Sequence, residues 1–174
     1  MNEHTGPELI KRAERDVKMR EKTRKSAFHW KPSIDTDNEK YLKKVVEQDG
    51  WPTISSVGAT ASQAAWLIVH HAHDVEFQKR CLALMHNLPD GEIDKANIAF
   101  LEDRILINEG KPQKYGTQFE ETGLSFGPYP IEDERNLDIR RAEMDLQPFA
   151  VYKASMIELY RPKKHSSEPG KTGQ

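Results

Sequence analysis

One histidine of this chain lies on an otherwise apolar helical line. At about 100° per residue, His71 falls on the same side as Ala64, Ile68, Val75 and Leu82. An imidazole in such a place needs a partner or a cavity, because an unsatisfied buried polar group is costly. Histidine also titrates near neutral pH, which suits a general acid or base. We therefore expect either a catalytic histidine or one whose bonds are satisfied inside the core.

Three more residues on expected helices could contribute to chemistry. Gln78 lies two turns beyond His71 on the same line, and Asp103 and Arg104 flank an apolar side of a later helix. An arginine in that place can clamp an anionic group while a carboxylate orients the group or a histidine. The alternative is a structural ion pair. We take His71 and Asp103 as candidate catalytic residues, and Arg104 and Gln78 as candidate substrate-binding residues.

A short polar loop supplies the other candidates. Tyr115-Gly116-Thr117-Gln118 follows directly after the expected end of a helix. Loops on a rigid scaffold often carry recognition, although a tight turn with a positive φ at the glycine explains the same residues. The candidate substrate-binding residues in this loop are Gln113, Tyr115, Thr117 and Gln118.

The histidines around position 71 also raise the question of a metal. His70 with His73, and His71 with Asp74, have the spacing that brings helical ligands to one face. Neither pair matches the two-histidine zinc signature with its intervening glutamate. We assign no metal ligand and no cofactor, while a metal-dependent hydrolase built on His71 and Asp74 stays open. The single cysteine, Cys81, is expected in the core rather than as a nucleophile.

The elements that must position these residues are helical. Apolar spacing and end signals predict helices over 8–25, 38–48, 61–85, 93–109, 133–144 and 149–160, and a break at 72–74 is left open. Residues 29–37 are expected to form a linker, and the Gly- and Pro-rich stretch from 118 to 130 an irregular loop without strands. The fold class predicted is all-α, a compact bundle of about five to six helices with a long irregular loop after the third core helix.

The same patterns predict how the chain is divided. A charged N-terminal helix and linker would occupy residues 1–37, a single helical domain residues 38–160, and a mobile polar tail residues 161–174. At 174 residues the chain is long enough to bury a real core.

Composition narrows the class of protein. The net charge of −2 disfavours a general nucleic-acid binder. Residues 1–25 are charged throughout, unlike a secretory signal. The longest apolar run, 64–69, is too short to span a bilayer. We expect a cytoplasmic protein with neither nucleic-acid nor membrane partners.

Several short motifs stand out: Gly50-Trp51-Pro52, Leu101-Glu102-Asp103-Arg104, Asn108-Glu109-Gly110-Lys111-Pro112-Gln113 and Tyr115-Gly116-Thr117-Gln118. With these motifs, the chain resembles an uncharacterised bacterial domain family over roughly residues 40–155. His71 matches the family, whereas His70 stands where its relatives carry glutamine. The family has no assigned chemistry, so the resemblance implies a coherent domain and transfers no catalytic residue.

These observations support three functional hypotheses. The leading one is a small soluble enzyme that acts on a polar or anionic small molecule or a peptide end, with His71 as acid or base. The first alternative is a non-enzymatic accessory protein that holds a peptide or a partner helix in an apolar groove. The second is the metal-dependent hydrolase. A homo-oligomer is compatible with all three.

Overall fold

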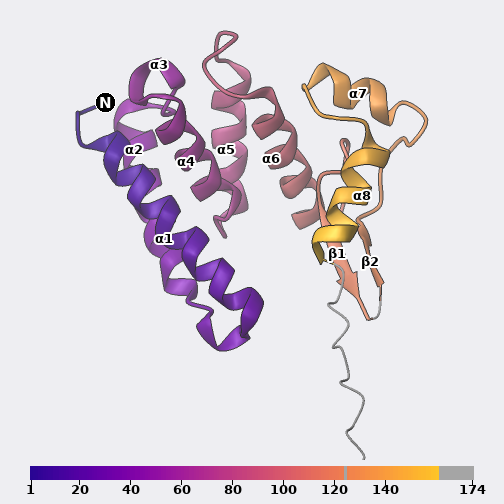
Figure 1. The fold of residues 1–174 in the computed structure, drawn as a ribbon. Coiled ribbons are helices and arrows are strands. Elements are labelled where there is room, and N and C mark those ends of the chain that lie inside the picture. Colours follow the sequence, from indigo (N-terminus) through magenta and orange to yellow (C-terminus); the bar gives the residue numbers. More distant parts are fainter. Residues whose placement is uncertain (124, 161–174) are drawn as a thin grey trace, which may run out of the picture.

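The computed structural model describes residues 1–123 and 125–160, and within them the chain is mostly helical (Figure 1). The elements are α1 (Thr5–Lys25), the 3-10 turn η1 (Ala27–His29), α2 (Pro32–Asp49), α3 (Ile54–Val57), α4 (Ala59–His70), α5 (Val75–His86), α6 (Lys95–Asn108), β1 (Phe119–Thr122), β2 (Ser125–Pro128), α7 (Leu137–Glu143) and α8 (Phe149–Tyr160). The described part thus holds eight α-helices, more than the five to six predicted. The mobile tail predicted over 161–174 lies outside the described residues.

The linker predicted over 29–37 is mostly wrong, because α2 begins at Pro32. Proline is favoured in the first turn of a helix, where its missing N–H would have no partner in any case. Asp35 in the same turn also suits the positive end of the helix dipole. Treating the proline as a helix breaker places the start of this helix six residues too late.

The long apolar stretch predicted over 61–85 is two helices. α4 ends at His70, and the Asp74 side chain caps α5 by accepting a hydrogen bond from the Phe77 N–H at 3.0 Å. The short helix α3 precedes α4 and begins with a capping box between Thr53 and Ser56.

The helix α4 is the centre of the hydrophobic core. It packs against α1, α2, α3, α5 and α6. The residues buried around it are apolar and come from all the long helices of this part: Leu9, Ala13, Leu42, Ala64, Ala65, Ile68, Val69, Phe77, Cys81, Met85, Leu101 and Ile105. The N-terminal helix therefore supplies core residues through Leu9 and Ala13.

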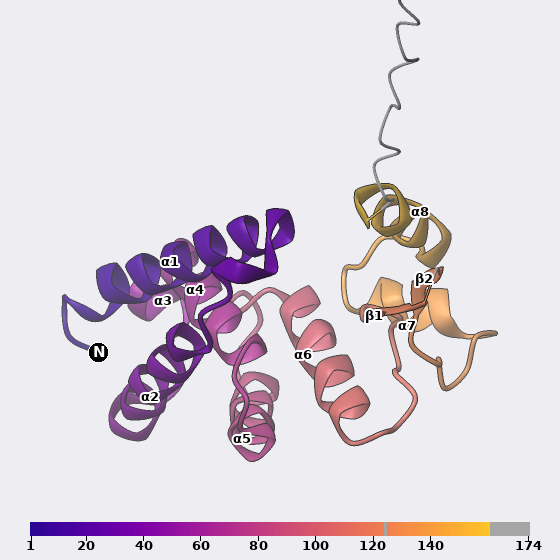
Figure 2. The same cartoon turned by 90° about the horizontal axis from the view of Figure 1, so that it is seen from below.

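The C-terminal part contains a β-hairpin, so the all-α prediction is wrong in this detail. β1 and β2 pair antiparallel from Phe119↔Pro128 to Thr122↔Ser125. α8 packs on β2 and α7 packs on α8. Figures 1 and 2 place this part beside α6, away from α2. Each strand is only four residues long, too short for the alternation that identifies a strand, and the glycines and the proline predict a loop.

None of the helices described here combines the length and the hydropathy that a membrane-spanning helix requires.

Candidate functional site

Asp103 organises the loop that follows α6. Its buried carboxylate accepts hydrogen bonds from the N–H groups of Lys114 (2.7 Å), Tyr115 (3.1 Å) and Thr117 (2.9 Å), and from the Thr117 hydroxyl (2.9 Å). Burial raises the pKa of Asp103, and these four donors offset only part of that effect. Both oxygens are thus occupied by the loop, and no histidine is among their partners in the described chain.

The side chains of the two glutamines in the loop form hydrogen bonds within it, mostly to main-chain groups. The Gln113 side chain bonds the main chain of Gln118. Gln113 is fully buried; its amide donates to the carbonyls of Gln118 (3.0 Å) and Tyr129 (2.9 Å) and accepts from the Gln118 N–H (2.9 Å). The Gln118 amide donates to the Thr117 hydroxyl (3.1 Å) and weakly to the Phe100 carbonyl (3.4 Å). These side chains connect the loop to α6 and to the segment after the hairpin.

Residues of α7 and α8 donate hydrogen bonds to two carbonyls of the loop. Arg141 donates to the Tyr115 carbonyl at 2.5 Å, and the Tyr152 hydroxyl donates to the Thr117 carbonyl at 3.0 Å. The Tyr115 hydroxyl in turn donates to Glu102 at 3.2 Å. The loop is therefore part of a hydrogen-bond network that joins the C-terminal part to α6.

Gln78 is also fully buried and is bonded to the scaffold. Its amide donates to the carbonyls of Val69 (3.1 Å) and Ala72 (3.2 Å), and its oxygen accepts from Asn108 at 3.4 Å. These carbonyls lie at the C-terminal end of α4, where helix carbonyls lack intrahelical partners. Gln78 thus holds the α4–α5 turn against the end of α6.

His71 has a different environment, because it pairs with a buried carboxylate from α1. Its Nδ1 lies 2.5 Å from Oδ2 of Asp16, whose side chain is 1% exposed, and the imidazole itself is 18% exposed. His71 is the C-cap residue directly after α4, with φ −94° and ψ −1°. No hydrogen bond to its Nε2 occurs within the described residues. The ring is therefore held on one nitrogen and open on the other.

Asp16 belongs to a larger charged network. Arg20 donates from Nε to Asp16 (2.8 Å) and from Nη2 to Asp35 (2.9 Å), and Asp35 Oδ2 lies 3.8 Å from His73. Burial acts to raise the pKa of Asp16, but the His71 hydrogen bond and the Arg20 charge outweigh it, so the pKa lies below its usual value. For Asp35 burial dominates and raises the pKa. The two buried carboxyls are thus shifted in opposite directions.

Arg104 and His70 add further basic groups near this network. Burial and then the positive charges of His71, Arg104 and Arg20 hold the pKa of His70 well below its usual value. The His70 ring stacks on Trp66 at 5.1 Å, and its Nδ1 is buried without a hydrogen-bond partner. Burial and the charge of Arg20 lower the pKa of Arg104. In the described chain, no carboxylate lies within ion-pair distance of Arg104.

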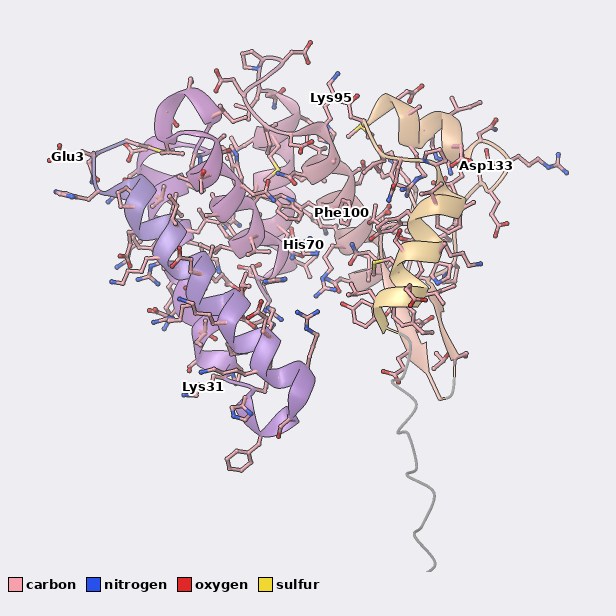
Figure 3. All side chains as sticks on the ribbon, viewed as in Figure 1. Glu3, Lys31, His70, Lys95, Phe100 and Asp133 are labelled. Atoms are coloured by element: carbon pink, nitrogen blue, oxygen red, sulfur yellow. The ribbon has the colours of Figure 1, made fainter. Side chains whose placement is uncertain are left out.

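The predicted site residues therefore fall into two groups. His71, Arg104 and Gln78 lie around the end of α4, where the first two act on His70 electrostatically. Asp103, Gln113, Tyr115, Thr117 and Gln118 form the loop network. Figure 3 shows His70 and Phe100 in the middle of the molecule, and Trp66 contacts both rings. No hydrogen bond or ring contact within the described residues joins Gln118 to His71.

The prediction missed Asp16, Arg20 and Asp35. A signal for the first two was present, because Asp16 and Arg20 continue the line of Leu9 and Ala13 on α1 at helical spacing. A carboxylate at a core position of a helix requires a partner. Asp35 fell inside the stretch predicted as a linker.

Of the metal-ligand pairs considered in the sequence, His71 and Asp74 are engaged elsewhere. His71 is bonded to Asp16, and Asp74 caps α5 and accepts from Lys43 at 2.7 Å. Within residues 1–123 and 125–160, no group of three or more His, Cys, Asp or Glu side chains is arranged to hold a metal ion. Cys81 is buried, which raises the pKa of its thiol to about 12.

Comparison with known proteins identifies a family. The model of the family described as a family of unknown function (DUF6624) matches residues 13–164, so this chain belongs to that family. The match begins within α1 and therefore includes Asp16 as well as His71 and the loop. No curated protein and no solved structure matches the chain.

Proposed function

We propose that the chain is a small enzyme in which His71, oriented by Asp16, acts as general acid or base on a small molecule or peptide end that carries an anionic group. The observation that carries the proposal is the 2.5 Å pair between His71 and the buried Asp16, with the second ring nitrogen open. In hydrolases and transferases such a carboxylate holds the imidazole in one tautomer and stabilises its charged form.

The tautomer follows from the charge of Asp16. Because the pKa of Asp16 is lowered, the carboxylate is ionised at neutral pH and can only accept a hydrogen bond. His71 Nδ1 must then carry the proton, and in the neutral ring Nε2 presents a lone pair. A proton taken from a substrate hydroxyl, water or amine would enter at Nε2 and later leave from it.

Arg104 is the candidate for holding the substrate. A partly buried guanidinium without a carboxylate partner can form two parallel hydrogen bonds with a carboxylate or phosphate. Arg20 cannot serve in the same way because its fork is bonded to Asp16 and Asp35. We therefore assign the orienting role to Asp16 rather than Asp103, and anion binding to Arg104.

The proposal is tested by turnover of a panel of small esters and amides that carry a carboxylate or phosphate group, followed by mass spectrometry. The variants are His71→Gln, Arg104→Met and the control His86→Gln, which changes an exposed histidine at the end of α5. We expect kcat to fall about 10²–10⁴-fold in His71→Gln, KM to rise in Arg104→Met, and the control to match the parent. A panel that the parent does not turn over, or turnover that survives His71→Gln, would count against the enzyme.

One observation favours the accessory-protein alternative. A groove of about 520 Å³ runs between α1 and α4, with Ile10, Val17 and Leu67 among its apolar walls. An amphipathic helix buries its apolar face in grooves of this kind. The test is the fluorescence of an apolar dye added to the parent and to Val17→Asp. Weaker fluorescence with Val17→Asp would show that the groove accepts apolar ligands. Unchanged fluorescence would argue against this alternative.

A further inference from the structure

A second hollow in the molecule has a strongly basic wall. It has a volume of about 370 Å³ and lies where the last turns of α1, the turn η1 and the first turn of α2 meet. Five basic side chains line it: Arg15, Lys18, Lys22, His29 and Lys31. Figure 3 shows Lys31 well away from His70, so this hollow is separate from the His71 site.

The charge of this wall contrasts with that of the whole chain. The protein carries 26 Lys and Arg against 28 Asp and Glu, yet no acidic residue lines the hollow among the residues described. Arg15 pairs with Asp37 at 2.9 Å, and Lys18 reaches Glu14 only at 4.0 Å. Like charges gathered without counter-charges repel one another, and a bound anion would relieve that repulsion.

Three of the five side chains have no acidic partner. Lys22, His29 and Lys31 are exposed and form no ion pair within the described chain. They come from α1, η1 and the N-cap of α2 respectively. Donors from three elements can surround a group that accepts hydrogen bonds on several sides, as a phosphate does with its oxygens. A planar carboxylate would use fewer of them.

The start of α2 adds to the same preference. Its N-cap residue, Lys31, provides no side-chain cap, Pro32 has no N–H, and the Ile34 N–H donates to the Lys31 carbonyl, so within the described chain the Ser33 N–H is the donor left at this helix end. Helix N-termini carry a partial positive charge and favour anions. Met19 and Ile34 complete the lining and give the hollow an apolar floor against which an organic group can lie.

We propose that this hollow binds the phosphate group of a small phosphorylated molecule, with Lys22, Lys31 and His29 as its main ligands and Met19 and Ile34 in contact with the organic part. The volume lies within the range of small-molecule sites. The proposal does not depend on His71 or on the enzymatic activity proposed above.

Isothermal titration calorimetry with inorganic phosphate and with phenyl phosphate tests the site. The variant is the double substitution Lys22→Gln/Lys31→Gln. Its matched control is Lys40→Gln/Lys44→Gln, which removes the same charge from exposed positions of α2 outside the hollow. Melting curves of both variants confirm that they are folded.

We expect the parent to bind both probes, and phenyl phosphate more tightly than inorganic phosphate because of the apolar floor. Affinity should fall at least about tenfold in Lys22→Gln/Lys31→Gln, since each lost charge-assisted hydrogen bond is worth that much, and remain within about twofold in the control. Absence of binding by the parent, or equal weakening in both variants, would overturn the site. So would a single-stranded oligonucleotide that binds more tightly than either probe and is insensitive to Lys22→Gln/Lys31→Gln.

Discussion

Replacing Asp16 by asparagine should destabilise the protein strongly. The Asp16 carboxylate is 1% exposed and accepts from both His71 and Arg20. Removing one partner of a buried charged network costs about 3–5 kcal/mol, because the remaining charges lose their compensation. For a domain of this size one kcal/mol shifts the melting midpoint by about 2–4 °C. We therefore expect Asp16→Asn to lower the midpoint by about 6–20 °C.

The matched control is Asp37→Asn. Asp37 also accepts from two arginines, Arg12 (2.8 Å) and Arg15 (2.9 Å), but its side chain is 54% exposed. Exposed ion pairs contribute about 0–1 kcal/mol, so the control should lower the midpoint by at most about 4 °C. Thermal unfolding followed by circular dichroism measures both variants. A loss in Asp16→Asn no larger than in the control would refute our interpretation of the buried network.

The pH dependence gives a second test of the same network. Folding lowers the pKa of Asp16 below the ordinary value of an aspartate, which is about 4. The ionised carboxylate therefore stabilises the fold above about pH 4. This contribution is lost as the pH falls through the folded-state pKa. The difference between the parent and Asp16→Asn should therefore narrow in acid. Asp35 has a raised pKa, so its ionisation costs stability, and Asp35→Asn should gain relative to the parent as the pH rises. If the stability difference between the parent and each variant did not depend on pH, both predicted directions would be contradicted.

Three further predictions concern separate features. Arg104→Met should leave the melting midpoint unchanged or raise it, because this partly buried charge has no carboxylate partner in the described chain and so contributes no ion pair there; a clear fall would make Arg104 structural. Asp103→Asn should cost about 3 kcal/mol and remove amide-exchange protection from the loop N–H groups that donate to it, and protection that persists would contradict the role given to this carboxylate. Gly116→Ala should destabilise more than Gly91→Ala in denaturant unfolding, since both have positive φ but only at Gly116 would a Cβ lie 2.7 Å from the Phe149 ring; equal losses would mean that the ring moves aside.

Helical periodicity predicted the elements whose burial is regular. The last helix was predicted over 149–160 and observed as Phe149–Tyr160, and α6 was predicted within two residues at its start and one at its end. The break at 72–74 could not be settled from one sequence, because a capping Asp74 and a continuous helix have the same residue pattern. The structure decides it through the Asp74 cap and the carbonyls that Gln78 satisfies.

The candidate site was predictable only in part, because polar residues on apolar lines identify burial without identifying partners. Gln78 and Asp103 were selected for this reason, and both are indeed buried, but their bonds go to the main chain. The partner of His71 is Asp16, which lies 55 residues away. Contacts over such a separation depend on how α1 packs on α4, and local spacing carries no information on that packing.

The most direct test of the proposed acid–base pair is the protonation of the two ring nitrogens of His71. A long-range proton–nitrogen NMR spectrum of the neutral ring, assigned with His71→Gln, distinguishes them. We expect a proton on Nδ1, where Asp16 accepts it, and an unprotonated Nε2, and we expect this preference to disappear in Asp16→Asn. A proton on Nε2 in the parent protein would leave His71 without an accessible base and would contradict the proposed function.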